Sequence, residues 1–362
     1  MVIMAGGSGK RLWPLSRQGM PKQLLRLVHG KSLLRMAFER VVDVVGAERV
    51  WVCTGAAYAD VVREELPEIP HDNILGEPVG RDSLNAVAWP AAVLARKDPD
   101  AVVAMVTADQ LIEPVDVFQD ALRRGFDAAE ADASALVTFG VVPDRPHTGY
   151  GYLHRGEPLN GSDEVCEVKE FREKPDHDTA KAYLASGEYW WNAGMFVWRA
   201  ATFLAQLAHL VPAGHDVVTE IADHPERVGE LFEQLPKISV DYAIMEPVSH
   251  GRGASVEGHK AHVVAVRLPI SWHDVGGFPA LGEHLERDEN GNAVEGRTVT
   301  LDARENLLIN TAGDDRLVAV LGLRDTVVVS TSDITLVCPA AQAERIKELV
   351  AKAADDHGVE FA

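Results

Sequence analysis

The chain has 362 residues, 46% of them hydrophobic and 25% charged, and this composition excludes disordered and collagen-like proteins. Its formal net charge of -20 disfavours binding to nucleic acid or to an anionic membrane surface, so a phosphate-bearing partner would need a local basic site. No apolar run is long enough to span a membrane or to act as a signal peptide. We therefore expect a cytoplasmic protein that binds neither nucleic acid nor membrane.

The first 142 residues alternate short apolar runs with helix-period segments. This pattern predicts a largely parallel sheet with helices on both faces. The predicted strands are residues 2–5, 50–53, 73–75, 101–107 and 135–141, and the predicted helices are residues 32–45, 57–66, 82–96 and 115–133. Pro90 lies inside the third of these helices and is expected to kink or shorten it.

Residues 143–289 have a different texture and are predicted to form a second lobe. Strands are expected at residues 148–152, 165–171, 189–198 and 262–268, and helices at residues 202–211, 217–235 and 240–245. With the first lobe, residues 1–142, this segment is predicted to form one domain, residues 1–289.

A third part begins at the turn signal Asn290-Gly291-Asn292. Short β-type runs follow it, and then a helical segment at residues 340–353, so residues 290–362 are predicted to be a small β-rich domain with a terminal helix. The expected fold class is α/β: a Rossmann-like mixed, largely parallel sheet with helices on both faces, plus this C-terminal domain. Such a domain is a reasonable dimerisation device, and we expect a homodimer.

Positive charge is concentrated at the start of the chain. From the first glycine turn to Phe38 there are seven Lys or Arg residues and no Asp or Glu. The turn is not a P-loop, because Met4 stands where the first glycine belongs, and it is not a dinucleotide fingerprint, because Leu12 stands at the third glycine position. We predict a glycine loop whose amide groups approach a polyanion. The nearby cations that would neutralise the ligand are Lys10, Arg11, Arg17 and Lys22.

An acidic residue follows the predicted central strand. Residues 101–107 are almost continuously apolar, as a buried parallel strand should be, and Asp109 comes just after them. Ligands of doubly wound sheets bind beyond the carboxyl ends of the strands, so Asp109 is a candidate for chemistry. A capping or turn aspartate is an equally open interpretation on this observation alone.

The opening segment carries a longer pattern, Gly6-Gly7-Ser8-Gly9-x-Arg11-Leu12-x-Pro14-Leu15-Ser16-Arg17-x-x-x-Pro21-Lys22-Gln23. It resembles the signature of the sugar-1-phosphate nucleotidyltransferases, and within that family the mannose-1-phosphate guanylyltransferases. Further matching motifs occur in order over the first 280 residues, namely Glu77-Pro78-x-x-Arg81, Phe171-x-Glu173-Lys174-Pro175, Trp191-Asn192-Ala193-Gly194-Met195-Phe196, Asp241-Tyr242-Ala243-Ile244-Met245-Glu246 and Trp272-x-Asp274-Val275-Gly276.

The resemblance implies transfer of GMP from GTP to mannose 1-phosphate, which gives GDP-mannose and pyrophosphate. It implies a nucleotide lobe at residues 1–142, a sugar-phosphate lobe at residues 143–289, and Mg²⁺ as the cofactor. The matching catalytic residues are Arg11, Lys22 and Lys174, and the matching metal ligands are Asp109 and Asp274. The nucleotide is expected to contact Gly6, Gly7, Ser8, Gly9, Glu77, Arg81 and Asn85. The sugar phosphate is expected to contact Gly149, Tyr150, Gly151, Glu173 and Asn192.

These residue types suit that reaction. A sugar phosphate is already largely dianionic at pH 7, because its second pKa is about 6, so its attacking oxygen needs no general base. The protein must instead position two polyanions and neutralise their charge, which calls for cationic side chains and a metal ion. Mg²⁺ typically takes one or two carboxylates and completes its shell with phosphate oxygens.

Two other functions stay open. One is a sister enzyme that uses another nucleotide or another hexose 1-phosphate, and the other is a regulatory subunit that binds GDP-mannose without turnover. The chain also departs from the family pattern at Gln110, where the family commonly has His, and at Pro90 and His273. The role of the motif from Asp241 to Glu246 is not settled by the sequence. The histidines lack metal-ligand spacing, so a zinc site is not expected.

Overall fold

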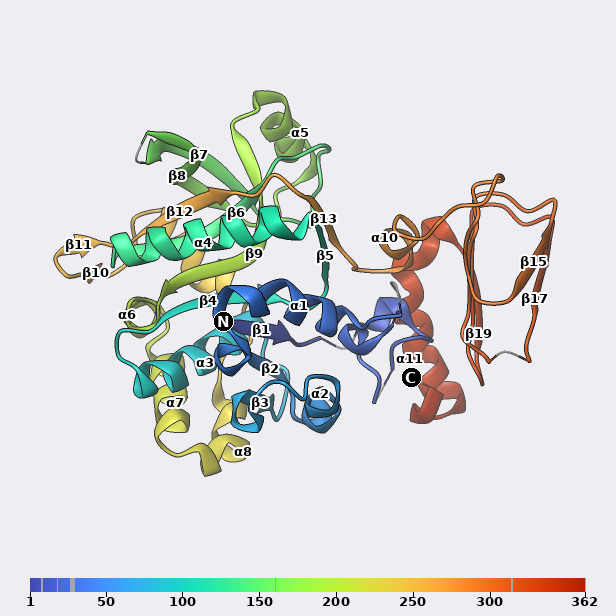
Figure 1. Cartoon of the computed structure of the whole chain (residues 1–362), viewed down its shortest axis with the longest axis horizontal. Coiled ribbons are helices and arrows are strands. Elements are labelled where there is room, and N and C mark those ends of the chain that lie inside the picture. The colour runs from blue at the N-terminus through green and yellow to red at the C-terminus, as the bar shows by residue number, and fades with distance from the viewer. Residues whose placement is uncertain (8, 18, 27–29, 160, 314, 362) are drawn as a thin grey trace. The chain divides into compact units, whose positions relative to one another are not determined.

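The computed structural model describes residues 1–362 except residues 8, 18, 27–29, 160, 314 and 362 (Figure 1). The chain divides into two compact units. The first, the sheet unit, contains Met1–Gly6, Ala37–Ala108 and Ile112–Trp272. The second, the β-domain unit, contains Gly7–Met36, Asp109–Leu111 and His273–Ala362.

The sheet unit is built on a mixed sheet that has nine strands within the described residues, in the order β3-β2-β1-β4-β9-β6-β12-β8-β7. Its parallel part contains β1 (Val2–Ala5), β2 (Trp51–Gly55), β3 (Ile74–Glu77) and β4 (Val102–Thr107). The remaining strands are β6 (Ala135–Val141), β7 (Tyr152–Leu159), β8 (Ser162–Arg172), β9 (Tyr189–Arg199) and β12 (His262–Arg267). β9 runs antiparallel between β4 and β6 and so joins the two lobes of the sheet.

Helices flank this sheet. They are α1 (Leu33–Val45), which begins in the β-domain unit, α2 (Ala59–Glu65), α3 (Ser83–Lys97), α4 (Val115–Ala131), α5 (His177–Ser186), α6 (Ala200–Leu210), α7 (Pro212–Asp223), α8 (Val228–Leu231) and α9 (Glu246–Ser249). α3 packs against α6 and α7, and α4 packs against β6 and β9. Within the described residues, no helix is long and apolar enough to cross a membrane.

Three local predictions differ from the structure. The helix predicted over residues 217–235 is wrong, because α7 ends at Asp223 and Pro225 begins a separate turn. The strand predicted at residues 148–152 is also wrong, since β7 begins only at Tyr152, after a loop that contains Gly149 and Gly151. Pro90 does not shorten α3, which continues for seven residues beyond it to Lys97.

In the β-domain unit, the described strands after Asn290 form two short sheets. Strands β14 (Ala293–Glu295), β16 (Leu307–Asn310) and β18 (Thr326–Ser330) are parallel, and β19 (Thr335–Pro339) closes that sheet antiparallel to β18. β15 (Thr298–Leu301) pairs in parallel with β17 (Val318–Leu321). A 3-10 segment and then α11 (Ile346–His357) follow. The predicted fold class, a mixed, largely parallel sheet with helices plus a C-terminal β-rich domain, is confirmed.

The core of the β-domain unit includes side chains from the segment Gly7–Met36. Its buried apolar side chains from the opening segment are Leu12, Trp13, Leu15, Leu25 and Leu33. They share one cluster with Phe278, Leu307, Ile309, Val327, Leu336 and Ile346. The 3-10 turn after the glycine loop, Lys10–Leu12, therefore packs against the C-terminal helix α11, although more than 250 residues separate them in the sequence. The predicted boundary near residue 290 stays a prediction.

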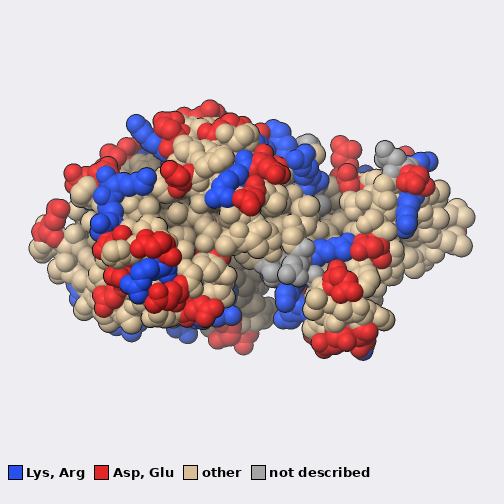
Figure 2. Space-filling view, turned by 90° about the horizontal axis from the view of Figure 1, so that it is seen from below, with Lys and Arg blue, Asp and Glu red and all other residues tan. Residues whose placement is uncertain are grey.

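Charge on the visible face of the molecule is mixed. Figure 2 shows Asp and Glu side chains spread over that face with Lys and Arg between them. The net negative charge is therefore distributed over this face, and binding of a polyanion would depend on a local group of cations.

Candidate active site

The opening glycine turn is shaped for a close approach of Lys22. The backbone φ angles of Gly7 and Gly9 are 100° and 60°, values that residues other than glycine rarely adopt. A Cβ at Gly9 would lie 2.5 Å from Cβ of Lys22, so a larger residue cannot occupy this position without displacing the lysine. The Ser16 hydroxyl donates to the Gly9 carbonyl at 2.6 Å and holds the turn closed. Ser8, predicted to bind nucleotide, lies outside the described residues.

Lys22 brings together the two predicted metal ligands. Its Nζ lies 2.9 Å from Oδ2 of Asp109 and 3.6 Å from Oδ1 of Asp274. Asp109 precedes β5 (Gln110–Glu113), Asp274 ends β13 (Ser271–Asp274), and these two short strands pair. The Val275 amide also donates to the Asp109 carbonyl at 3.1 Å. The fold thus places carboxylates from distant parts of the sequence around one buried ammonium group.

Burial and charge both act on the Asp274 carboxylate of this group. Burial raises the pKa of Asp274, and the neighbouring charge of Asp109 raises it further, whereas Lys22 and Arg11 lower it. Among the described residues there is no group of three or more His, Cys, Asp or Glu that would hold a metal by itself. Two carboxylates are nevertheless the donor set that Mg²⁺ accepts when phosphate oxygens supply further ligands, so the residues present fit this ion.

Arg11 lies beside Asp274 with its guanidinium accessible. A Cβ at Gly276 would lie 3.4 Å from Nη2 of Arg11 and 3.5 Å from Oδ2 of Asp274, so both side chains lie against this glycine at ordinary contact distance. Arg11 also forms an ion pair with Glu344 at 3.2 Å, in which both side chains are exposed, by 45% and 71%. Exposed ion pairs contribute little free energy, so a phosphate group can replace Glu344 at low cost.

The predicted sugar-phosphate residues form a second group, inside the sheet unit. Nδ2 of Asn192 donates to Oδ1 of Asp241 at 2.9 Å, and the Thr138 hydroxyl donates to Oδ1 of Asn192 at 2.7 Å. Lys174, which has a φ of 44, forms an ion pair with the buried carboxylate of Glu173. The structure therefore brings Glu173, Lys174 and Asn192 together and adds Asp241 to them, while their binding of a sugar phosphate stays a prediction.

The packing of this group requires a glycine at position 151. A Cβ there would lie 2.6 Å from Oε2 of Glu173 and 3.3 Å from Cβ of Asn192, so only glycine leaves the carboxylate in place. The Asn192 amide also donates to the Gly151 carbonyl at 2.8 Å. Gly149 and Tyr150 lie in the preceding loop. The Gly149 amide donates to Nδ1 of His147, and the Tyr150 ring stacks on the His147 ring at 3.9 Å.

Asp241 is a candidate whose role the sequence left undecided. Burial raises its pKa, and the neighbouring charge of Glu173 raises it further. Burial also disfavours the charged form of Lys174, but the hydrogen bond and charge of Glu173, with the charge of Asp241, outweigh this effect and raise the pKa of Lys174. The family motif beginning at Asp241 was the signal for this residue, but the motif alone did not distinguish a helix cap from a ligand.

The three predicted nucleotide-side residues of the sheet unit differ in their surroundings. Nδ2 of Asn85 donates to the carbonyls of Arg81 at 2.8 Å and Pro236 at 2.7 Å, and Nη2 of Arg81 donates to the Glu233 carbonyl. These bonds hold the start of α3 against residues 233–236. Glu77 is only 7% exposed, and among the described residues its Oε1 has no hydrogen-bond partner. Burial raises the pKa of Glu77 to about 7.

Two of the three departures from the family pattern, Gln110 and His273, are adjacent in sequence to the metal candidates. Gln110 is buried in β5, directly after Asp109. Nδ1 of His273 lies 3.5 Å from Oε2 of Glu283, and its ring meets the ring of His284 edge-on at 4.4 Å. Both positions therefore carry side chains that are packed within the structure.

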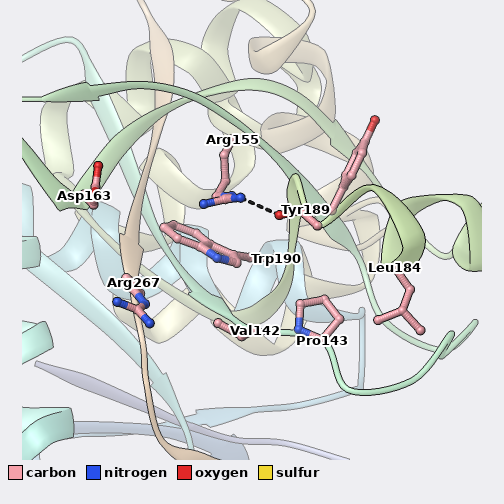
Figure 3. Close-up of a pocket in the computed structure, with 9 residues that line it drawn as sticks. Val142, Pro143, Arg155, Asp163, Leu184, Tyr189, Trp190 and Arg267 are labelled. Carbon is pink, nitrogen blue, oxygen red and sulfur yellow. Dashed lines mark hydrogen bonds between the residues drawn. The ribbon is translucent and has the colours of Figure 1, made fainter.

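A cavity of about 420 Å³ lies elsewhere in the sheet unit (Figure 3). It is lined by Val142, Pro143, Arg155, Asp163, Leu184, Gly187, Tyr189, Trp190 and Arg267. Figure 3 shows Arg155 above the Trp190 ring, from which its Cζ is 5.3 Å away, and Arg155 also donates to the Gly187 carbonyl. Because this arginine serves the local fold and no predicted site residue lines the cavity, the candidate site lies elsewhere.

Two family models match the chain. The model described as "Nucleotidyl transferase" matches residues 1–291. The model described as "MannoseP isomerase/GMP-like beta-helix domain" matches residues 296–352. Together the two matches cover both the large sheet and the small β-rich segment.

Individual relatives agree with these models. The mannose-1-phosphate guanylyltransferases of Klebsiella pneumoniae and Escherichia coli are each 38% identical over 361 residues, which span 96% of this chain and 72% of each relative. A crystal structure from Thermus thermophilus, described as a mannose-1-phosphate geranyltransferase, matches with a TM-score of 0.83 and 31% identity. That match covers 97% of this chain and 98% of the other.

Proposed function

Because the chain belongs to the nucleotidyl transferase family, we propose that it transfers GMP from GTP to mannose 1-phosphate and releases pyrophosphate and GDP-mannose. The observation that carries the proposal is the convergence of Asp109 and Asp274 on Lys22, against the glycine turn. This is an arrangement for binding a polyphosphate together with a metal ion. The curated relatives named as mannose-1-phosphate guanylyltransferases supply the choice of substrates.

In this proposal Asp109 and Asp274 hold Mg²⁺. The ion would neutralise negative charge on the phosphates of GTP. Lys22 and Arg11 bind nonbridging phosphate oxygens, and the amides of the glycine turn contact the nucleotide. Lys22 has two functions, because it also offsets the repulsion between the two carboxylates.

The second group of residues binds the acceptor. Lys174 neutralises the phosphate of mannose 1-phosphate, whose oxygen attacks the α-phosphorus in line and needs no general base. Glu173 and Asp241 accept hydrogen bonds from sugar hydroxyls, and Asn192 is held in place by Thr138. Because Gly151 has no side chain, the Glu173 carboxylate can lie against its backbone and stay in place.

Glu77 is the proposed reader of the base. Guanine presents two adjacent N–H donors, N1–H and N2–H, and a carboxylate accepts both of them. Uracil and thymine present one donor on the corresponding edge, and adenine and cytosine place an acceptor there. Glu77 is buried, and its Oε1 has no hydrogen-bond partner among the described residues, so a guanine base would satisfy a group that the protein leaves unsatisfied.

The test is pyrophosphate release with each of four nucleotides, GTP, ATP, UTP and dTTP, combined with mannose 1-phosphate and with glucose 1-phosphate. We expect turnover to be fastest with GTP and mannose 1-phosphate, and to require Mg²⁺. A preference for UTP or dTTP would establish the sister-enzyme alternative. Binding of GDP-mannose without turnover of any pair would establish the regulatory subunit.

We also propose that the protein is a cytoplasmic homodimer. Exposed apolar side chains on β15 and β17 support a subunit contact, with Leu301 64% exposed, Leu321 70% exposed and the two paired in register. Light scattering after gel filtration is expected to give twice the mass of the chain. Leu301→Asp should shift that mass toward the monomer. A monomeric mass for the unmodified protein would refute the dimer.

A further inference from the structure

Arg17 belongs to the opening signature but does not offer its charge to a ligand. Its Nη1 and Nη2 donate to the two carboxylate oxygens of Asp333, each at 2.7 Å, and Nη2 also donates to the Thr331 hydroxyl at 3.3 Å. The hydrogen bond to Asp333 raises the pKa of Arg17, and Arg17 holds the pKa of Asp333 well below its usual range. Two-point pairs of this kind are the strong and directional class of ion pair. This pairing indicates a function for Arg17 other than neutralising a polyanion, which stays a prediction.

The partners of Arg17 lie in the turn between β18 and β19. The Thr331 amide donates to the Ile334 carbonyl at 2.8 Å, and the Thr331 hydroxyl donates to Asp333 at 3.1 Å, so the turn itself is fixed. β18 is held on one side by β16 and on the other by β19. Arg17 thus contacts a braced part of the C-terminal strands.

Arg17 also stands where the opening segment reverses. The Arg17 amide donates to the Met20 carbonyl at 3.0 Å, and the Met20 amide donates to the Arg17 carbonyl at 2.9 Å. This turn returns the chain so that Lys22 reaches Gly9. The preceding residue, Ser16, closes the glycine turn through its bond to the Gly9 carbonyl.

The opening segment has little regular structure of its own. Its described regular elements before α1 are two 3-10 turns, Lys10–Leu12 and Lys22–Leu24. A single helical turn is not stable in isolation, so its shape must come from tertiary contacts. Besides the Arg17 contact, Nε1 of Trp13 donates to the Phe361 carbonyl at 2.6 Å.

We propose that the turn between β18 and β19 positions the nucleotide phosphates, with Asp333 and Thr331 acting through Arg17 to hold the reversal that places Lys22 against the glycine turn. Asp333, Thr331 and Arg17 are proposed as positioning residues, since Asp333 and Thr331 bond to Arg17 and would act on the loop through it. The identity of the ligand rests on the proposed function, whereas the control of the loop by Asp333 does not.

The first measurement is independent of any ligand. Hydrogen exchange of the free protein is compared between the wild type and Asp333→Asn, which keeps the shape of the side chain and removes its charge. We expect exchange at residues 9–17 to become ~10-fold faster, the effect of losing a charge-assisted hydrogen bond, while exchange in β16 and β18 is unchanged. Unchanged exchange at residues 9–17 would overturn the proposal even if the protein is an active transferase.

The second measurement is kinetic. In Asp333→Asn we expect the KM for GTP to rise ~10-fold and the KM for mannose 1-phosphate to stay within ~2-fold, because the proposed acceptor group has its contacts in the sheet unit. A role in stability alone would lower Tm and leave both KM values unchanged. The milder variant Thr331→Val should move the KM for GTP in the same direction. If both KM values rise equally, selective positioning of the nucleotide is refuted.

A matched control and a coupling test complete the design. Lys352 and Asp356 form an ion pair of 2.6 Å on α11 of the same unit, so Asp356→Asn removes a comparable charge without touching the loop. That variant should leave exchange at residues 9–17 unchanged. Arg17→Met should reproduce the Asp333→Asn phenotype, and the double variant should be no worse than either single variant. Additive losses would overturn the proposal, because they would mean that the two residues act separately.

Discussion

Replacing Glu77 by Gln is expected to stabilise the free protein at neutral and alkaline pH while weakening its choice of guanine. The Glu77 carboxyl is buried, and its pKa is raised from 4.5 to about 7. The folded protein therefore keeps a proton on Glu77 in a pH range where the unfolded chain has lost it. In this range the free energy of unfolding falls as pH rises, and the loss runs from about pH 4.5 to about pH 7.

The magnitude follows from the shift. A change in pKa of about 2.5 units, at 1.36 kcal/mol for each unit, corresponds to about 3 kcal/mol of lost stability once the pH exceeds about 7. Gln does not titrate, so the variant escapes this loss. The stability of Glu77→Gln relative to the wild type should therefore rise by about 3 kcal/mol between pH 4.5 and pH 8.

The assay is urea unfolding of both proteins at pH 4.5, 6 and 8. The control is the variant Glu157→Gln, which changes an exposed glutamate of the same unit. The control should follow the wild type at every pH. Turnover of Glu77→Gln with GTP should decrease relative to its turnover with other nucleotides, because an amide accepts only one of the two guanine N–H groups. Parallel stability curves for the wild type and Glu77→Gln would refute the argument from burial, and unchanged nucleotide preference would refute base reading.

Two further substitutions test the remaining parts of the site. Asp109→Asn should reduce Mg²⁺-dependent turnover ~100-fold or more, since a metal ion between phosphates contributes several kcal/mol, while the unfolding transition is kept; near-normal turnover would remove Asp109 from the metal site. Gly151→Ala places a methyl group 2.6 Å from Oε2 of Glu173, so we expect the KM for mannose 1-phosphate to rise ~10-fold with the KM for GTP unchanged. An unchanged KM for mannose 1-phosphate would show that Glu173 and Gly151 do not shape the acceptor site.

Sequence patterns predicted the regular parts of this fold well, because those parts depend on local signals. The strand β4 is a nearly continuous apolar run, and all seven residues of β6 are buried, as a central strand requires. The helix predicted over residues 217–235 failed because its apolar period continued past Pro225, which ends it. The apolar periodicity predicted a continuous helix there, whereas the proline predicted a helix end, and the structure follows the proline.

The parts of the candidate site that lie in one continuous motif could be predicted from the sequence. The parts that depend on a contact with a distant residue could not. Lys22 and the glycine turn were found from one continuous pattern, and their contact explains why Gly9 must be glycine. Nothing in the sequence links Arg17 to Asp333, which lies 316 residues away. Asp241 likewise became a candidate ligand only when the fold placed it beside Asn192. Such pairings depend on tertiary packing and leave no local pattern.

In the proposed reaction GMP passes directly from GTP to mannose 1-phosphate. ³¹P NMR of the wild-type protein with both substrates and Mg²⁺ follows every phosphate of this reaction. We expect GDP-mannose and pyrophosphate to appear in equal amounts while GTP and mannose 1-phosphate disappear, and no reaction to occur when Mg²⁺ is removed by a chelator. Release of pyrophosphate with GMP in place of GDP-mannose, or persistence of both substrates, would contradict it.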